Sequence, residues 1–196
     1  MKTTAAFLDR DGVINVAIRG RWVDHADDFE LYPYSVDAIK LLNDHDIPVF
    51  VVTNQSGVAR GTLSHAQYYA MSAKMLTAFE QAGVKITRIY ECLHAKDGSV
   101  NCPCRKPKTG MIDNAMREYQ LEPGKMWFVG DMATDIEMAH RANLTPIMVQ
   151  SGLCNDEEMA GALEITKELG KDLYVDTDLY KACQRIICSL SPGSTS

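Results

Sequence analysis

Two carboxylates lie two residues apart near the start of the chain, at Asp9 and Asp11, and a glycine follows them. They come directly after a short apolar segment typical of a buried strand, where unpaired carboxylates are costly without a positive partner. Mg²⁺ is such a partner, because it prefers oxygen ligands and usually retains waters and a substrate phosphate. The pair therefore predicts a carboxylate that attacks phosphorus beside one that transfers protons. On its own, the pair also fits a simple Asp-Gly turn capped by Asp11.

A third carboxylate, Asp131, follows another apolar segment and opens a helical pattern. It is placed to supply a further ligand to the same cation. Asp135 comes four residues later and shares the helix face with Asp131. The alternative for both residues is helix capping, since carboxylates at a helix N-terminus are favoured by free N–H groups and by the helix dipole.

Hydroxyl and cationic groups that suit a phosphoryl group occur at two other segment ends. Thr53 offers a hydroxyl after a strand, and the loop at Ser56 offers backbone N–H groups. Lys106 supplies a point charge, whereas Arg105 can bind a phosphate or a sugar hydroxyl through two nitrogens. Donors of this kind act on the equatorial oxygens of a transferring phosphoryl group. Arg105 and Lys106 could instead be an ordinary solvated basic pair.

Four metal-binding side chains lie close together just before that basic pair, at Cys92, His94, Cys102 and Cys104. Three thiolates and an imidazole make a complete tetrahedral set for Zn²⁺, which leaves no open position and predicts a structural metal. The metal would order a loop that has little core of its own, and would fix the adjacent basic pair. The alternative is three unrelated buried cysteines and a surface histidine.

The elements that must position these groups alternate between strand and helix. Six short apolar segments rich in β-branched residues are typical of buried strands, at Thr4–Leu8, Ile47–Thr53, Ile86–Cys92, Met126–Val129, Pro146–Val149 and Leu173–Val175. Helical patterns separate and follow them, at Ser35–Asn43, Ser64–Ala82, Gly110–Tyr119, Thr134–Ala142, Asp156–Leu169 and Leu179–Ser189. Ser64 is a good N-cap, Gly83 a good helix stop, and Asp178 a candidate cap for the last helix.

This alternation predicts an α/β fold, a three-layer sandwich with a central parallel sheet between two layers of helices. In such sheets ligands bind beyond the carboxyl ends of the strands, where all the polar groups above fall. The stretch between Thr53 and Cys92 holds one helix and one strand, so we expect no inserted cap domain. We expect a single phosphatase-type domain over residues 1–190, with a zinc-binding loop at 92–104 and a disordered tail at 191–196.

Composition limits the partners. The chain has 196 residues and a formal net charge of −6, which argues against nucleic acid as a bulk partner. No apolar run is long enough for a membrane helix, and the charged N-terminus does not fit a secretory signal. The absence of Gly-x-Gly-x-x-Gly and P-loop patterns argues against a nucleotide-binding fold. We therefore expect a cytoplasmic monomer with a small anionic substrate, neither membrane-bound nor bound to nucleic acid.

The combination of motifs resembles the haloacid dehalogenase-like superfamily of phosphatases, whose four ordered motifs match residues 4 to about 150. The resemblance implies Asp9 as nucleophile, which forms a phosphoaspartyl intermediate, and Asp11 as general acid and base. It places Thr53 and Lys106 on the phosphoryl group. It places Mg²⁺ on Asp9, on the backbone carbonyl of Asp11 and on Asp131. The substrate-binding residues that follow from it are Arg10, Asn54, Gln55, Ser56 and Arg105.

The Cys/His loop is similar to that of the zinc-containing branch, which includes D-glycero-D-manno-heptose 1,7-bisphosphate 7-phosphatases and histidinol-phosphatase domains. The segment from Thr53 to Gly61 is closer to the heptose enzymes, so the resemblance implies hydrolysis of the 7-phosphate of a heptose 1,7-bisphosphate. The segment from Ala17 to Gly20 would also face the substrate. Met132 stands where the heptose enzymes tend to have a basic residue. Histidinol phosphate or another small sugar phosphate is the alternative substrate.

Two readings outside this class remain. One is a catalytically idle, zinc-ordered binding domain, which is difficult to reconcile with a full set of catalytic positions. The other makes the Cys/His cluster a hydrolytic zinc centre, but such centres keep an open position and a nearby Glu. Glu91 is adjacent in sequence to Cys92, yet on a strand the two side chains should point to opposite faces.

Overall fold

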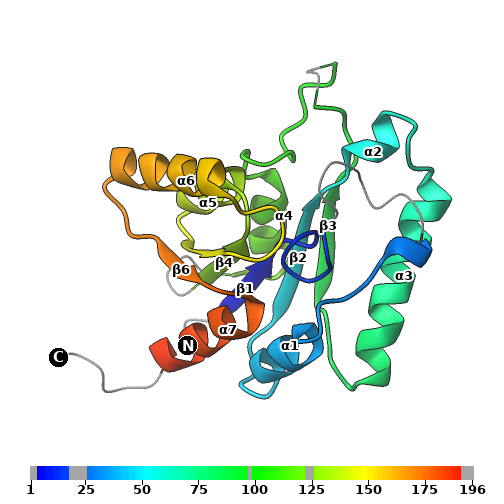
Figure 1. Ribbon diagram of the computed structural model, residues 1–196, viewed down its shortest axis with the longest axis horizontal. Coiled ribbons are helices and arrows are strands. Elements are labelled where there is room, and N and C mark those ends of the chain that lie inside the picture. Colours follow the sequence, from blue (N-terminus) through cyan, green and yellow to red (C-terminus); the bar gives the residue numbers. More distant parts are fainter. Residues whose placement is uncertain (1–3, 18–25, 97–98, 122–125, 191–196) are drawn as a thin grey trace.

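A computed structural model of the chain describes residues 4–17, 26–96, 99–121 and 126–190. Its centre is a six-stranded, fully parallel sheet in the order β3-β2-β1-β4-β5-β6, with helices on both faces (Figure 1). The strands are β1 (Ala5–Leu8), β2 (Val49–Asn54), β3 (Arg88–Cys92), β4 (Met126–Gly130), β5 (Thr145–Val149) and β6 (Tyr174–Asp176). The predicted three-layer α/β fold is confirmed.

Seven α-helices and one 3₁₀ helix connect the strands within the described residues. They are η1 (Ala26–Asp28), α1 (Ser35–Asn43), α2 (Ser56–Ala59), α3 (His65–Gln81), α4 (Gly110–Glu118), α5 (Ala133–Arg141), α6 (Asp156–Leu169) and α7 (Leu179–Leu190). Each predicted strand and helix is present, with ends that differ by at most two residues. The short elements η1 and α2 had no signal in the sequence, because one turn of helix is too brief to show a periodic pattern.

The predicted helix ends are confirmed. The Ser64 hydroxyl accepts from the backbone N–H of Gln67, whose side chain accepts in turn from the Ser64 N–H, so a capping box opens α3. Gly83 follows α3 with a φ of 69°, a conformation that glycine adopts without strain. The Asp178 carboxylate accepts from the N–H of Lys181 in the first turn of α7. Local side-chain chemistry therefore fixes where these helices begin and end.

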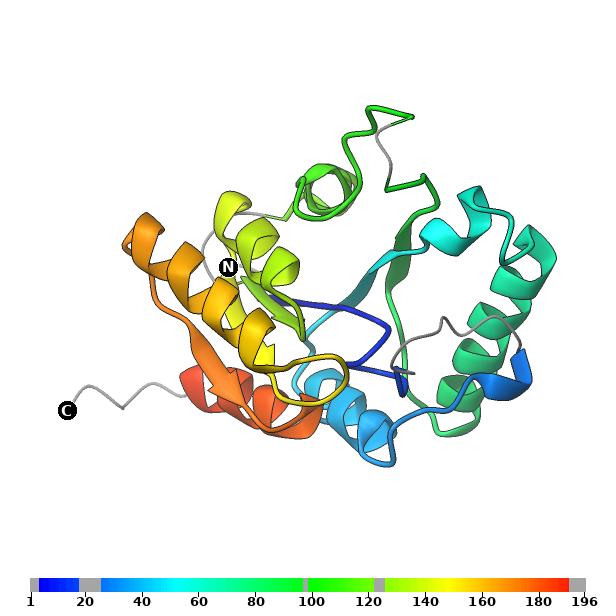
Figure 2. The same cartoon turned by 45° about the horizontal axis from the view of Figure 1, so that its top comes forward.

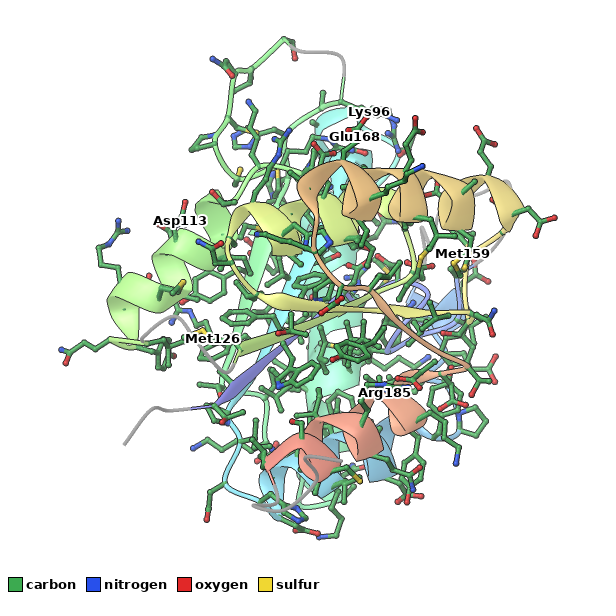
Figure 3. The ribbon with its side chains drawn as sticks, turned by 90° about the vertical axis from the view of Figure 1, so that its left-hand side faces the viewer. Lys96, Asp113, Met126, Met159, Glu168 and Arg185 are labelled. Atoms are coloured by element: carbon green, nitrogen blue, oxygen red, sulfur yellow. The ribbon has the colours of Figure 1, made fainter. Side chains whose placement is uncertain are left out.

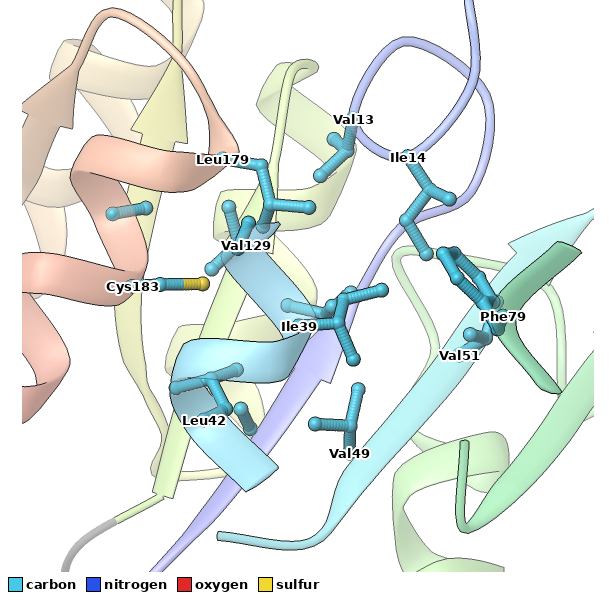
Figure 4. Packing of buried hydrophobic residues seen from close by; sticks show 14 of the residues in the cluster. Val13, Ile14, Ile39, Leu42, Val49, Val51, Phe79, Val129, Leu179 and Cys183 are labelled. Carbon is cyan, nitrogen blue, oxygen red and sulfur yellow. The ribbon is translucent and has the colours of Figure 1, made fainter. Parts of the chain in front are cut away.

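The sheet has two buried faces with different helices. The larger core lies under α1, α3 and α7 and includes Leu8, Val51 and Val129 (Figure 4). The other core lies under α4 and α5 and includes Phe7, Phe50 and Phe128. Alternate residues of β1 enter opposite cores, as the pleat of a strand requires. α6 packs outside α5, through a small cluster formed by Ile136, Met148 and Ala162.

The strand order places the start of the chain at the centre of the functional edge. The chain builds β1, β2 and β3 outward in one direction and then returns to add β4, β5 and β6 on the other side of β1. The switch in direction falls between β1 and β4, where ligands bind in sheets of this type. Asp9 lies at this point, and its backbone N–H donates to Val129 O of β4 at 2.9 Å.

The same edge has no additional domain above it in the described part of the chain. Between β2 and β3 the chain forms only α2 and α3, as predicted. The loop after β3 and the short α2 stand side by side beyond the carboxyl ends of the strands (Figure 2). Among the described residues, no helix combines the length and the apolar character needed to cross a bilayer. Residues 18–20 of the predicted substrate-facing segment, and the predicted disordered tail at 191–196, lie outside the described residues.

Candidate active site

The carboxyl ends of the strands surround one cavity of about 660 Å³. Asp9 and Asp11 reach it from the loop after β1, Thr53 from β2, and Asp135 from the start of α5. Cationic side chains also line it; they include Arg60, Lys96, Arg105, Lys106, Lys108 and Arg141. Of the groups that the sequence placed at separate strand ends, Asp9, Asp11, Thr53 and Lys106 therefore meet in one hollow, whereas the buried Asp131 does not line it.

Lys106 is the charge at the base of this cavity. Its Nζ lies 2.7 Å from Asp9 Oδ1 and 2.7 Å from Asp135 Oδ1, and the side chain is buried. Although burial lowers the pKa of Lys106, the two carboxylates raise it above its ordinary value, so the ammonium stays charged. The backbone of Lys106 is fixed to β2, because its N–H donates to Asn54 Oδ1 at 3.1 Å and its carbonyl accepts from Asn54 Nδ2 at 3.4 Å.

Three buried carboxylates lie close together here, and two of them, Asp9 and Asp135, contact that ammonium. Asp9, Asp131 and Asp135 each offer an oxygen, and these oxygens all lie within 4.8 Å of one another. Burial raises the pKa of Asp9 to about 7 although Lys106 opposes the shift. Burial, followed by the charges of Asp9 and Asp135, raises the pKa of Asp131 well above its ordinary range. The cluster has more negative charge than Lys106 can balance.

The same cluster fits a divalent cation with oxygen ligands. Asp131 Oδ2 accepts from the backbone N–H of Leu153 at 2.7 Å, whereas its Oδ1 is buried without a hydrogen-bond partner in the described structure. An unpartnered, buried carboxylate oxygen beside Asp9 is suited to coordinate a hard cation such as Mg²⁺. Gly12 keeps this space open: it has a φ of +90°, and a Cβ there would lie 2.1 Å from Asp131 Oδ2.

Asp11 lies at the cavity edge and outside that cluster. Arg10 donates to both of its oxygens, Asn15 Nδ2 donates to Oδ1 at 3.0 Å, and Gln55 Nε2 donates to Oδ2 at 2.6 Å. Burial acts to raise the pKa of Asp11, but the Arg10 guanidinium and these amides hold it below its ordinary value. The carboxylate is therefore stabilised as an anion by three donors.

The predicted substrate-binding residues fall into two groups. Asn54, Ser56 and Arg105 line the cavity, and the Ser56 hydroxyl accepts from Arg60 Nη1 at 2.8 Å. Arg10 and Gln55 do not line it, because both are buried and turned toward Asp11. Gln55 Nε2 also donates to Thr53 Oγ1 at 2.9 Å, which leaves the threonine hydroxyl proton free to face the cavity.

The predicted zinc ligands converge into one compact centre. Cys92 Sγ lies 3.8 Å from Cys102 Sγ and 3.5 Å from His94 Nδ1, which lies 3.3 Å from Cys104 Sγ. A tetrahedral zinc site with Zn–S bonds of about 2.3 Å and Zn–N bonds of about 2.0 Å has neighbouring ligand atoms about 3.5–3.8 Å apart. The separations therefore fit a four-coordinate ion without an open position.

This centre is connected to the active-site cavity through the residues that follow it. Arg105 Nη1 donates to the His94 carbonyl at 3.3 Å, and Lys108 Nζ donates to the Cys102 carbonyl at 2.7 Å. Cys92 itself is the fully buried last residue of β3. The loop is thus attached to the core at one end and holds cationic side chains over the cavity at the other.

Three contributors to the site were not among the predicted site residues, although the sequence had placed one of them, Asp135, on the same helix face as Asp131. Asp135 joins the carboxylate cluster and pairs with Lys106, and the capping role considered for it is also present: its Oδ2 accepts from the Met132 N–H at 3.2 Å. Its position four residues after Asp131, on the same helix face, was the sequence feature that could have indicated a place in the carboxylate cluster. Asn15 and the Leu153 N–H had no such signal, because a turn and a crossover loop bring them to the site.

The chain is similar to a family of hydrolases and to phosphatases from several bacteria. Residues 103–177 match a family model described as HAD-hydrolase-like. The chain is 35% identical to D-glycero-alpha-D-manno-heptose-1,7-bisphosphate 7-phosphatase of Campylobacter jejuni, over 82% of this chain and 88% of that protein. It is 36% identical to D-glycero-beta-D-manno-heptose-1,7-bisphosphate 7-phosphatase of Escherichia coli K12, over 76% of this chain and 80% of that protein.

Solved structures give the same grouping. The fold matches the crystal structure of D,D-heptose 1,7-bisphosphate phosphatase from B. bronchiseptica complexed with magnesium and phosphate. The TM-score is 0.80, the sequence identity is 31%, and the match covers 95% of this chain and 99% of that chain. This similarity spans nearly the whole fold and is not limited to one motif.

Proposed function

Because this chain belongs to the HAD-like hydrolase family, we propose that it is a Mg²⁺-dependent phosphatase that hydrolyses the 7-phosphate of D-glycero-D-manno-heptose 1,7-bisphosphate. The observation that supports this most directly is the base of the cavity. There Asp9 lies 2.7 Å from the Lys106 ammonium and within 4.8 Å of two further carboxylates. This juxtaposition supports Asp9 as the nucleophile, Lys106 as the phosphate-binding cation and the carboxylate cluster as the Mg²⁺ site.

The reaction proceeds in two displacements at phosphorus. In the first, an Asp9 oxygen forms a bond to phosphorus and the bond from phosphorus to the sugar oxygen breaks. Asp11 gives that oxygen a proton, which releases the sugar and leaves a phosphoaspartyl group. In the second, Asp11 takes a proton from a water molecule, whose oxygen attacks phosphorus. Inorganic phosphate leaves, and the Asp9 carboxylate is restored.

The remaining groups stabilise the transferring phosphoryl group. Lys106 and the Thr53 hydroxyl interact with its equatorial oxygens, where charge accumulates in the transition state. Asp9, Asp131 and the Asp11 carbonyl would hold Mg²⁺, which neutralises the charge of the carboxylates and of the phosphate. A Zn²⁺ ion on the four Cys/His ligands would be structural and would keep Arg105 over the cavity.

The cavity lining favours a substrate that has more than one anionic group. The whole chain has a net charge of −6, yet Arg60, Lys96, Arg105 and Lys108 line the cavity in addition to Lys106. A monophosphate needs one cationic site beside the nucleophile, which Lys106 provides. The additional cations are suited to a second phosphate on the same sugar. In this function the protein acts as a cytoplasmic monomer on a free metabolite.

The decisive test compares substrates under steady-state conditions. Both anomers of the heptose 1,7-bisphosphate and histidinol phosphate are supplied to the Mg²⁺- and Zn²⁺-loaded protein, and phosphate release gives kcat/KM for each. We expect a heptose bisphosphate to be the best of the three. Faster hydrolysis of histidinol phosphate would reject the proposed substrate, but it would still agree with the proposed phosphatase reaction. The anomer is open, because the related proteins include both alpha and beta enzymes.

A further inference from the structure

Arg10 is a fully buried arginine whose side chain has no part in the steps described above. Its exposed fraction is only 1%, and its guanidinium lies against the Asp11 carboxylate. Arg10 Nη2 lies 3.0 Å from both Asp11 oxygens, and Nε lies 3.3 Å from Oδ1. Two nitrogens of one guanidinium thus approach the carboxylate side-on, a geometry that fixes direction as well as distance.

The guanidinium is itself immobilised. It lies over the rings of Phe29 and Tyr68, with the carbon Cζ 5.9 Å and 5.5 Å from their centroids. The Arg10 carbonyl accepts the N–H groups of Ile14 and Asn15 at 2.9 and 3.1 Å, which closes a tight turn around Asp11. A side chain held between two aromatic rings below a closed turn cannot follow a ligand in the cavity.

Two amides complete the support on the other sides of the same carboxylate. Asn15 is fully buried and donates to Asp11 Oδ1 at 3.0 Å, while Gln55 donates to Oδ2 at 2.6 Å. Every partner is a donor, so both oxygens are held, while the Asp11 side chain keeps 30% of its surface exposed and faces the cavity. Only the exposed side of the carboxylate is left for a substrate oxygen or a water molecule.

We infer that Arg10 is a positioning residue, which fixes the Asp11 carboxylate at the cavity edge for proton transfer and does not bind the substrate. This inference rests on the proposed function, in which Asp11 gives a proton to the leaving sugar oxygen. If the side-on pair is lost, the carboxylate can rotate, and protonation of the leaving group becomes slow. Substrate binding depends on other side chains and is unchanged.

The variant Arg10→Lys tests this, because it keeps the charge and removes the side-on geometry. The sugar oxygen is a strongly basic leaving group that needs a proton, whereas the nitrophenolate of p-nitrophenyl phosphate does not. We expect the single-turnover release of the sugar to slow by about 10- to 100-fold, and that of nitrophenolate by less than about threefold. KM for the bisphosphate should stay within about threefold of the unaltered value.

Two further variants make the result specific. In an Asp11→Asn background, Arg10→Lys should cause almost no additional loss, since its effect passes through Asp11. Arg185→Lys is the matched control: Arg185 also forms a side-on pair, with Asp176 at 2.7 and 2.8 Å, but on α7, away from the cavity. Figure 3 shows Arg185 on the α7 side of the sheet and Lys96 of the Cys/His loop on the other side. Arg185→Lys should not slow the single-turnover release of either the sugar or nitrophenolate.

Several outcomes would overturn the inference. A large increase in KM with unchanged single-turnover rates would make Arg10 a substrate ligand. If Arg10→Lys slows the release of sugar and of nitrophenolate equally, the role of Arg10 is merely structural. The same conclusion follows if Arg10→Lys slows sugar release as much in the Asp11→Asn background as in the unaltered protein. If Arg10→Lys does not fold, Gln55→Met removes another donor to Asp11 and must show the same preference between leaving groups. An unaltered protein that releases phosphate from neither compound would overturn the proposed function and this inference together.

Discussion

At the scale of single residues, the site is organised by one ammonium among several carboxylates. Lys106 Nζ contacts Asp9 and Asp135 at 2.7 Å each, and Asp131 is nearby with an unpartnered oxygen. Asp11, by contrast, has its own cation in Arg10. Two aspartates that are two residues apart therefore have opposite environments: burial raises the pKa of Asp9 to about 7, whereas Arg10 and two amides hold the pKa of Asp11 below its ordinary value. The structure thus gives each of the two carboxylates its own cation, Lys106 for Asp9 and Arg10 for Asp11.

The assignment of Asp9 as nucleophile predicts the effect of its amide. Asp9→Asn keeps the shape of the side chain but cannot form the phosphoaspartyl bond, so we expect phosphate release to fall by at least roughly 1,000-fold. The measurement is steady-state phosphate release at saturating Mg²⁺. Asp44→Asn, which changes an exposed carboxylate paired with Lys40 on the surface, should retain normal activity. A variant Asp9→Asn with full Mg²⁺-dependent activity would contradict the assignment.

At the scale of elements, the position of Lys106 depends on the loop that connects β3 to α4. The loop from β3 to α4 is held at both ends, since Cys92 is buried in the core and the Lys106 backbone is paired with Asn54 of β2. Between those ends, four metal-binding side chains come within 4.8 Å of one another. A Zn²⁺ ion on this cluster would order the part of the loop between those ends.

Removal of zinc should therefore weaken the enzyme without touching the nucleophile. Cys104→Ser removes one ligand next to Arg105, and we expect loss of the equimolar zinc together with a rise in KM for the bisphosphate of about tenfold. Metal analysis and steady-state kinetics check both effects. Cys188→Ser, which changes an exposed cysteine on α7, is the control and should retain zinc and KM. Loss of zinc with unchanged kinetics would show that the zinc-bound order of the loop is not needed for substrate binding.

The contact between α5 and α6 contains a buried histidine that makes stability depend on pH. The Thr166 hydroxyl donates to the Ala162 carbonyl at 2.7 Å, so its oxygen accepts from His140 Nε2 at 3.2 Å. His140 Nδ1 is buried without a hydrogen-bond partner among the described residues. Burial, and then the nearby Lys171 ammonium, lowers the pKa of His140 below its ordinary value of 6.5. The folded protein therefore favours the neutral ring.

The sign of the resulting effect follows from proton uptake. Above about pH 6.5 His140 is neutral in both states, and its contribution to stability is complete. As the pH falls below 6.5, the unfolded chain binds a proton that the folded chain resists, so the free energy of unfolding decreases. We expect His140→Gln to reduce this decrease in urea unfolding between pH 7 and 5. His45→Gln, which changes an exposed histidine after α1, should leave it unaltered.

At the scale of the whole molecule, the fold concentrates charge at one edge of the sheet. The chain has a net charge of −6, but the cavity beyond the carboxyl ends combines a buried acidic cluster with cationic walls. The acidic cluster is a cost to the metal-free fold, since one ammonium contacts only two of its three buried carboxylates. Any cation that binds them stabilises the entire domain by mass action.

Magnesium should consequently raise the thermal stability of the protein even without substrate. At a Mg²⁺ concentration about 100 times Kd, the free energy of unfolding should increase by about 2.7 kcal/mol. Thermal unfolding with and without Mg²⁺ measures this. In Asp131→Asn the increase should disappear, while the metal-free Tm should rise because the cost of burying this carboxyl group is removed. Asp113→Asn, an exposed change on α4, is the control, and an unaltered Mg²⁺ response in Asp131→Asn would contradict the metal site.

Much of the fold was determined by local patterns in the sequence. Apolar segments fixed the six strands, and Ser64, Gly83 and Asp178 fixed helix ends, because capping and periodicity act over a few residues. The ligand set at Cys92, His94, Cys102 and Cys104 could also be predicted from the sequence. Three thiolates and one imidazole form a complete tetrahedral set for zinc, and the structure brings the four side chains together.

The tertiary structure alone decided how the polar groups are paired. The sequence pointed to Arg10 as a substrate ligand, but the turn after β1 buries it below Asp11. The sequence was also compatible with a purely capping role for Asp135, but the start of α5 places its carboxylate in an ion pair with Lys106. Side-chain direction after a strand depends on turns and on packing between segments far apart in the chain, which residue type and spacing do not encode. The motifs therefore specified the chemistry, and the fold determined which carboxylate each cation holds.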